Sequence, residues 1–273
     1  MDTARRGLCV AGALALAGCA AAPDPLNSTT SATATAAAIA ELGGTGKLRA
    51  AINFGNPILA NRNANGEAYG VSVDLAREAA RRLGLPAELV LFNSAGNVVD
   101  AIKAKQVDLA FVAIDPVRAA DMDYTSPYVI IEGAYLVRND SALQRNDDVD
   151  KAGTRVAVGR GSAYDLFLTR ELKSATLVHA PTSPAVTDLF IAQNLEVAAG
   201  VKQQLQGDAK RVGGVRLLPG RFMVIEQAMG VPKGRLAAQA WLSGFIEEMK
   251  ASGFVADALK RHGIEGAAVA QRA

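Results

Sequence analysis

The chain has 273 residues, half of them hydrophobic, and a formal net charge of +2 at pH 7. This length accommodates one large domain or two smaller ones, and the hydrophobic content is sufficient for a sizeable core. Nucleic-acid binding usually needs a concentrated basic surface, so the near balance of charge argues against nucleic acid as a partner.

The N-terminus has the pattern of an export signal. Arg5 and Arg6 precede an apolar stretch, residues 7–17, that is too short to span a bilayer but suits a signal peptide. The next residues, Leu-Ala-Gly-Cys ending at Cys19, resemble the bacterial lipoprotein box, in which the cysteine becomes the lipidated first residue. Ordinary signal-peptidase cleavage after Cys19 is the alternative. We expect a lipoprotein signal peptide over residues 1–18 and a lipid anchor at Cys19.

The segment that follows is rich in Ala, Thr, Ser, Gly and Pro and has almost no large apolar side chain. Such a segment buries too little surface to offset its ordering entropy. We therefore expect a disordered tether over residues 19–46, with order beginning near Lys47. The only cysteines are Cys9 and Cys19, so the mature fold has no thiol pair for a disulfide.

Strand-like and helix-like segments alternate after this tether. Strands are predicted at 48–53, 88–92 and 107–114, and helices at 73–83 and 98–104, from apolar runs and from helical spacing of apolar residues. The order β-α-β-α-β is typical of a mainly parallel sheet covered by helices.

The same order recurs in the second half of the chain. Strands are predicted at 155–158, 177–179 and 196–199, and helices at 163–172 and 184–193. The C-terminal part is again helical. Two α/β lobes of this size fit the length, and no second stretch of 18 apolar residues indicates a membrane span.

One strand-to-turn junction favours anion binding. Asp115 and Pro116 predict a helix start after a buried strand, with Arg118 in its first turn. A helix N-terminus carries free N–H groups, and a guanidinium matches a carboxylate in bidentate fashion. Open α/β sheets bind ligands at such strand ends. The alternative is a surface ion pair of Arg118 with Asp115, Asp121 or Glu132.

A second junction, residues 159–163, lies between a predicted strand and helix. Gly161 would let the backbone approach a ligand, and Ser162 offers a hydroxyl. A plain βα turn is the alternative, because the run lacks the third Gly of a dinucleotide fingerprint and the Lys of a phosphate loop.

Other classes of site find little support. His179 and His262 lie far apart in the sequence, and no cysteine accompanies them in the mature chain, so we expect no metal site. The Gly-x-Ser-x-Gly motif of α/β-hydrolases is absent. We expect no catalytic residue and no cofactor. Glu132 follows an apolar run, where it would either meet a ligand amine or hydroxyl or be a surface carboxylate.

Three pieces carry a resemblance to a known family. Residues 106–111 (QVDLAF), then Arg118, then residues 123–128 (DYTSPY) resemble family 3 of the bacterial solute-binding proteins, which serve amino-acid ABC transporters. The resemblance covers residues 46–263. Weaker pieces in the same order lie at residues 46–49, 70–76, 153–158 and 249–253.

The resemblance implies a type II periplasmic-binding-protein fold: two α/β lobes, each a mainly parallel sheet flanked by helices, joined by two hinge strands. Lobe 1 would comprise residues 47–130 plus 225–265, and lobe 2 residues 131–224. The protein would be a monomer of the periplasm or cell envelope, held at a membrane by its lipid. It would pass a small ligand to an ABC permease in the inner membrane.

The resemblance also implies the site. Arg118 would grip the ligand's α-carboxylate, while Phe111 and Ala113 in lobe 1 and the turn at residues 161–163 in lobe 2 would offer backbone groups. The full set of expected ligand-binding residues is Asn53, Phe54, Asn56, Phe111, Ala113, Arg118, Glu132, Gly161, Ser162, Ala163 and Val201.

The chain departs from the family pattern at several of these positions. Family members usually carry Ser or Thr at Ala113 and Ala163, and at Val201 an Asp that holds the α-ammonium. An aromatic residue usually lies near Asn56, for which Phe54 is the candidate substitute. The carboxylate half of the site is therefore kept and the ammonium half is lost. We expect a carboxylate ligand without a free α-amine, or with an amine that reaches Glu132.

Two other functions fit the same fold. Periplasmic cyclohexadienyl dehydratases resemble these proteins, and Glu132 or Asp115 would then be the general acid. The other function is that of a sensor input domain. We do not expect it, because the sequence shows no membrane span or signalling domain before its end at residue 273. Solute binding is the function that we expect.

Overall fold

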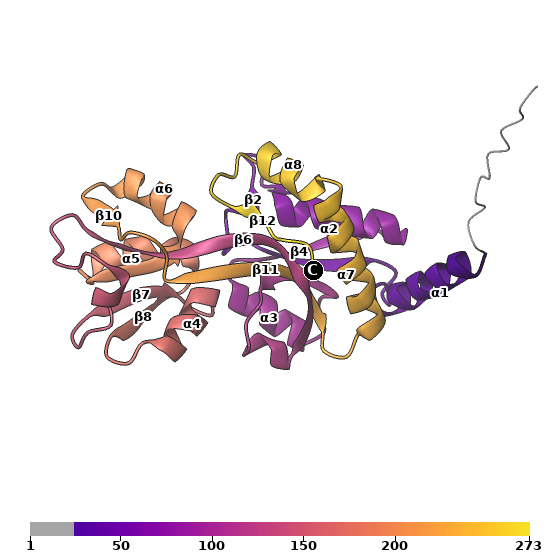
Figure 1. The fold of residues 1–273 in the computed structure, drawn as a ribbon, viewed down its shortest axis with the longest axis horizontal. Coiled ribbons are helices and arrows are strands. Elements are labelled where there is room, and N and C mark those ends of the chain that lie inside the picture. Colours follow the sequence, from indigo (N-terminus) through magenta and orange to yellow (C-terminus); the bar gives the residue numbers. More distant parts are fainter. Residues whose placement is uncertain (1–24) are drawn as a thin grey trace, which may run out of the picture.

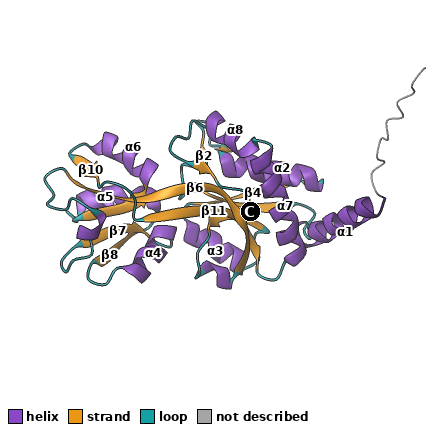
Figure 2. Cartoon of the chain, viewed as in Figure 1, coloured by secondary structure: helices purple, strands orange, loops and turns teal. Residues whose placement is uncertain are grey.

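The computed structural model describes residues 25–273. One mixed sheet runs the length of the molecule, with helices on both of its sides (Figures 1 and 2). Within the part of the chain that the structure describes, no helix has both the length and the apolar character needed to cross a lipid bilayer. The predicted signal peptide over residues 1–18 and the anchor at Cys19 lie outside the described residues.

The first half of the sheet belongs to lobe 1, whose strands β4, β1 and β5 are parallel neighbours. Its strands are β1 (Leu48–Asn53), β4 (Ala87–Phe92) and β5 (Leu109–Ala113), and its helices are α2 (Val71–Leu83), α3 (Ala95–Lys103), α7 (Leu236–Ala251) and α8 (Phe254–Arg261). In α2 the apolar spacing buries Leu75, Ala79 and Leu83, and Gly84 ends the helix with a φ of 66°.

The other half belongs to lobe 2, in which β9, β7 and β8 are parallel neighbours. Its strands are β7 (Arg155–Gly159), β8 (Thr176–Ala180), β9 (Val197–Val201) and β10 (Val215–Leu217), and its helices are α4 (Ala163–Glu171), α5 (Val186–Ala192) and α6 (Lys202–Val212). Ser162 caps α4 by accepting a hydrogen bond from the Asp165 N–H at 3.0 Å.

Two long antiparallel strands connect the lobes. β6 (Met122–Arg138) pairs with β9 of lobe 2, and β11 (Met223–Pro232) pairs with β5 of lobe 1. The two strands also pair with each other, so the sheet order is β4-β1-β5-β11-β6-β9-β7-β8. This is the predicted architecture of two mainly parallel lobes joined by two strands.

Short elements complete the fold. They are β2 (Asn61–Arg62), β3 (Ala68–Tyr69), β12 (Ala268–Val269) and the 3-10 turns η1 (Arg118–Ala120), η2 (Asn146–Asp148) and η3 (Ser183–Ala185). Both faces of the sheet are buried in each lobe: in lobe 1, Ile52 packs in the cluster on one face and its neighbour Ala51 in the cluster on the other. Strands buried on both faces have continuous apolar runs, as in β5.

The structure differs from the predicted tether over residues 19–46. Residues Pro25–Leu42 form helix α1, which projects beside α7 at one end of lobe 1 (Figure 1). Ala38 and Leu42 are fully buried, and the Ala238 N–H donates to Glu41 Oε2 at 2.8 Å. The segment is rich in alanine, the strongest helix former, so a few apolar contacts with lobe 1 suffice to hold it as a helix. The predicted lobe boundaries at residues 130/131 and 224/225 stay a prediction.

Candidate functional site

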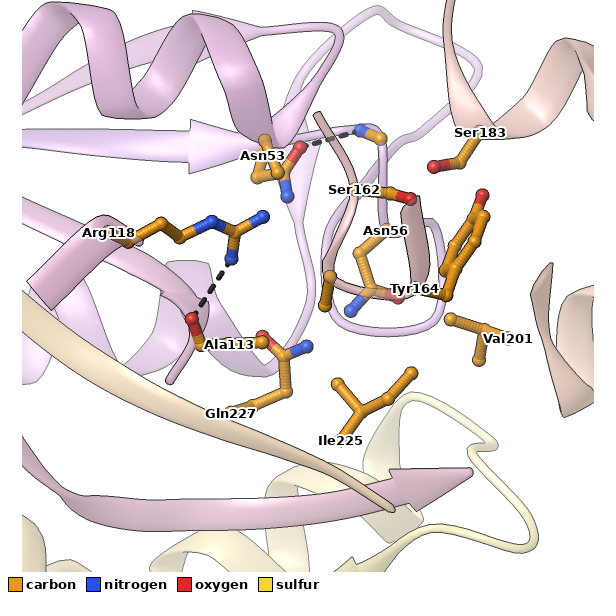
Figure 3. Close-up of a pocket in the computed structure, with 13 residues that line it drawn as sticks. Asn53, Asn56, Ala113, Arg118, Ser162, Tyr164, Ser183, Val201, Ile225 and Gln227 are labelled. Atoms are coloured by element: carbon orange, nitrogen blue, oxygen red, sulfur yellow. Dashed lines mark hydrogen bonds between the residues drawn. The ribbon is translucent and has the colours of Figure 1, made fainter. Parts of the chain in front are cut away.

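A cavity of about 30 Å³ lies between the lobes, and we call it the cleft cavity (Figure 3). Its lining comes from both lobes and from β11, and strand ends supply much of it, as expected for open α/β sheets. Lobe 1 contributes Asn53, Gly55, Asn56, Ala95, Ala113 and Arg118; lobe 2 contributes Ser162, Ala163, Tyr164, Ser183 and Val201; and β11 contributes Ile225 and Gln227.

Arg118 is the charged group of this lining. Its side chain is only 3% exposed, and it donates from Nη1 to the Ala113 carbonyl at 3.0 Å and from Nη2 to the Gly161 carbonyl at 2.8 Å. Within the described residues its Nε has no hydrogen-bond partner and its guanidinium has no ion pair. Burial lowers the pKa of Arg118, although nearby Tyr124 and Asp115 oppose that shift. A buried cation held only by neutral carbonyls is a strong site for an anion.

The predicted helix start at Asp115 is wrong. Asp115 Oδ1 accepts a hydrogen bond from the Val117 N–H at 2.8 Å, and only the 3-10 turn η1 follows before β6 begins at Met122. The capping residues form a turn instead, because the Asp115 carboxylate accepts the Val117 N–H and the chain enters β6 directly after η1. The contribution to anion binding comes from the Arg118 side chain and not from a helix dipole.

The turn before α4 brings lobe 2 to this arginine. Gly161 has a φ of +69°, its N–H donates to Asp165 Oδ2 at 2.8 Å, and its carbonyl accepts from Arg118. Asp165 also contacts His179 Nε2 at 2.9 Å. A Cβ at Gly161 would lie 3.1 Å from the Gly96 Cα of lobe 1. Gly161 therefore permits both the turn and the close approach of the two lobes.

The two acidic candidates lie outside the lining of the cleft cavity. Glu132, on β6, accepts from Lys202 at 2.8 Å and from Arg221 at 2.7 Å, and these hydrogen bonds lower the pKa of its carboxyl group. Asp115 is 3% exposed, and its Oδ2 pairs with Arg170 of lobe 2 at 3.0 Å. Both carboxylates already have cationic partners within the protein.

Two aromatic candidates also lie outside the lining. The Phe54 ring packs under the Arg62 guanidinium at 4.5 Å, and the buried Phe111 ring meets Tyr128 edge-on at 6.1 Å. Asn56 lies at the cavity instead, and its Oδ1 is a buried acceptor without a hydrogen-bond partner among residues 25–273.

The remaining expected residues surround the cavity. Asn53 holds the turn after β1 by accepting the Gly55 N–H at 2.9 Å, and Ala113, Ser162, Ala163 and Val201 all contribute to the lining. Gly161 contributes through its carbonyl bond to the arginine.

Sequence reasoning missed Gly55 and five lining side chains, of which Ala95 is the smallest. Ser183 follows the end of β8, a position that the strand pattern could have flagged, whereas Tyr164 lies one residue beyond the expected turn. Burial raises the pKa of the Tyr164 hydroxyl to about 12. Ile225 and Gln227 lie on β11, which carries no local motif and reaches the cavity only through its long-range pairing with β5 and β6.

Comparison with solved structures shows the same fold in several proteins. The solute receptor for L-cysteine of Neisseria gonorrhoeae superimposes with a TM-score of 0.74 at 22% identity, covering 84% of this chain and 94% of that one. A mutant of ArgBP from T. maritima gives a TM-score of 0.73 at 20% identity, covering 84% of this chain and 100% of that one. The ancestral amino acid-binding protein AncCDT-1, a precursor of cyclohexadienyl dehydratase, gives a TM-score of 0.70 at 20% identity. The match covers 82% of this chain and 98% of that one.

These likenesses establish the type II periplasmic-binding-protein fold. No curated protein sequence matches the chain significantly. A family model, however, matches residues 48–264, which include all the strands of the main sheet except β12 and nearly all of both lobes. The chain belongs to the bacterial extracellular solute-binding proteins, family 3.

Proposed function

We propose that this protein is the extracytoplasmic solute-binding component of an ABC importer, and that it binds a small carboxylate-bearing ligand between two closing lobes. It acts in the periplasm or cell envelope as a monomer anchored through Cys19, with lobe 1 over residues 47–130 plus 225–265 and lobe 2 over residues 131–224. Membership of an extracellular solute-binding family supports the transport role.

The observation that carries the carboxylate is Arg118. It is the charged side chain of the lining, it is almost fully buried, and its partners within the described residues are the uncharged carbonyls of Ala113 and Gly161. A carboxylate in the cleft cavity would supply both a counter-charge and an acceptor for the unpaired Nε. Structural neighbours whose names mention amino-acid ligands favour a small carboxylate of this size class.

Enzyme activity on the same fold has less support. A dehydratase would need a general acid at the cavity. Among the described residues, the lining holds no carboxyl group, and Glu132 and Asp115 each have cationic partners elsewhere. One neighbour is a precursor of a dehydratase but is itself an amino acid-binding protein. We therefore propose binding without turnover, so that a bound compound is recovered unchanged.

Calorimetry and X-ray scattering with a panel of small carboxylates test this function. Wild-type protein should bind at least one of them and become more compact, and Arg118→Ala should weaken binding by at least about tenfold because charge-assisted hydrogen bonds are lost. Arg216→Ala is the matched control, since Arg216 also donates to two backbone carbonyls but lies in lobe 2 away from the cavity. Unchanged affinity in Arg118→Ala, or conversion of the ligand, would contradict the proposal.

A further inference from the structure

The cleft cavity pairs a single positive charge with otherwise neutral walls. Of its lining side chains, Arg118 is the one that carries a charge at neutral pH. The wall opposite is apolar where Val201 ends β9 and Ile225 projects from β11 (Figure 3). Val201 is 5% exposed. A ligand in this cavity therefore meets one cation and no anion among the described residues.

An ammonium group on the ligand would have no counter-charge here. The acidic side chains near the site already have partners: Glu132 is held by Lys202 and Arg221, and Asp115 by Arg170. Asp165 lies outside the lining and accepts from the Gly161 N–H while contacting His179. Closing the lobes strips water from whatever lies between them. A buried ammonium without an anionic partner is strongly unfavourable, and it would also repel the arginine beside it.

The uncharged polar groups of the cavity suit a hydroxyl instead. The buried Oδ1 of Asn56 lacks a donor among the described residues, and the side chains of Asn53, Ser162, Ser183 and Gln227 also reach the cavity. A ligand hydroxyl donates to such an amide oxygen without bringing a charge, whereas a keto oxygen cannot donate. A free hydroxyl can also accept from the amide and hydroxyl donors nearby.

We propose that the ligand is a short 2-hydroxy monocarboxylate whose carboxylate pairs with Arg118 and whose hydroxyl takes the place of an α-ammonium. This inference rests on the proposed carboxylate-binding function. The cleft cavity of about 30 Å³ holds only about two or three water-sized groups, so a short carbon chain needs the least movement of the lobes. Val201 is the residue that excludes the amino acid.

Isosteric pairs provide the test. Isothermal titration calorimetry compares L-lactate with L-alanine, and L-2-hydroxyisovalerate with L-valine, on the full chain. Within at least one pair the hydroxy acid should bind about tenfold or more tightly than the amino acid, because only the latter buries an unpaired ammonium. Equal or tighter binding of the amino acids would overturn this inference while leaving the carboxylate site intact. Binding of none of the four compounds would also overturn this inference, whereas carboxylate binding that survives Arg118→Ala would overturn the carboxylate site itself.

Substitution at Val201 tests the cause. Val201→Asp places a carboxylate at the apolar wall and should shift the amino-acid to hydroxy-acid affinity ratio toward the amino acid by about tenfold or more. Val201→Asn is the matched control, similar in shape but neutral, and should leave the ratio within about threefold of wild type. An unchanged ratio in a folded Val201→Asp protein, judged by its thermal unfolding, would refute the role of this residue. If that variant does not fold, the wild-type pairs still decide the inference.

Discussion

The two lobes lie close together at a pair of glycines, Gly96 and Gly161, and enlarging Gly161 should oppose closure. A Cβ at Gly161 would lie 3.1 Å from the Cα and 3.4 Å from the N of Gly96. Gly96 is in the first turn of α3, so these neighbouring atoms are backbone and cannot rotate away. Gly161→Ala requires the two segments to move apart by a few tenths of an ångström. Slight separation of the lobes provides this movement, so we expect the variant to bind ligand weakly.

The expected loss follows from the hydrogen bond that closure forms. The Gly161 carbonyl accepts from Arg118 Nη2 at 2.8 Å, and a hydrogen bond to a charged donor contributes about 1.5–3 kcal/mol. Losing it weakens binding by about tenfold to a hundredfold, since each ~1.4 kcal/mol corresponds to a factor of ten. The positive φ of Gly161 adds a separate cost of about 1 kcal/mol for alanine. This backbone strain is the same in the open and the closed form of the variant. It therefore lowers the melting temperature of the protein but does not change its affinity for the ligand.

Calorimetry measures the affinity of Gly161→Ala for the tightest carboxylate of the panel, and X-ray scattering measures its compaction on binding. Gly96→Ala is the matched control at the same contact. Its Cβ would lie 3.7 Å from the Gly161 Cα, an ordinary van der Waals distance, and alanine favours the helix. We expect this control to bind nearly as wild type does. Wild-type affinity and full compaction in Gly161→Ala would refute the reasoning.

Three further predictions concern the anchor, the core and acid stability. Cys19→Ala should release the protein from membranes, and a native intact mass without acyl chains on Cys19 would contradict the lipid anchor. Lys250 buries its ammonium against Glu247 and two backbone carbonyls. Lys250→Met leaves these groups without a partner and should lower the free energy of unfolding by about 3 kcal/mol in denaturant titrations. A loss below about 1 kcal/mol would contradict this prediction. Hydrogen bonds from Arg81 and a neighbouring arginine lower the Glu78 pKa from 4.5 to about 2. Its ion pairs therefore stabilise the fold above pH 4.5 and cease to do so as the pH falls through about 2. The stability gap between wild type and Glu78→Gln, about 0.5–1 kcal/mol at neutral pH, should close over that range, and a gap independent of pH would contradict it.

The alternating pattern of the fold could be read from local sequence because each element carries its own signal. Helix α2 shows why: its buried apolar residues recur at helical spacing and Gly84 stops it. Helix α6 was missed because Leu205 is its one buried residue and most of its other residues are polar. The Asp115-Pro116 pair led to the wrong prediction of a helix start, because residues that cap helices also stabilise tight turns. The entry of the chain into the long strand β6 directly after this turn decided the outcome, and local sequence does not reveal it.

The site could be predicted only where it lies at the ends of strands with recognisable sequences. Arg118 and the turn at Gly161 follow β5 and β7 and were expected to face the cleft. Gln227 could not be expected there, because its position depends on the pairing of β11 between β5 and β6 and on register shifts beside it. The partners that occupy Glu132 also come from distant elements. Long-range pairing of this kind leaves no periodic trace in the sequence.

The path of the chain through the sheet has a consequence for how the molecule is made. Lobe 1 takes its strands from both ends of the chain, because β5 needs β11, more than 100 residues later, as its neighbour. The parallel strands and helices of lobe 2 come from one continuous stretch. Joining distant segments costs chain entropy before their contacts form, which slows assembly. During synthesis, the backbone amides of lobe 2 are therefore expected to become protected from hydrogen exchange first. Lobe 1, which carries Arg118, becomes protected only after β11 has been synthesised.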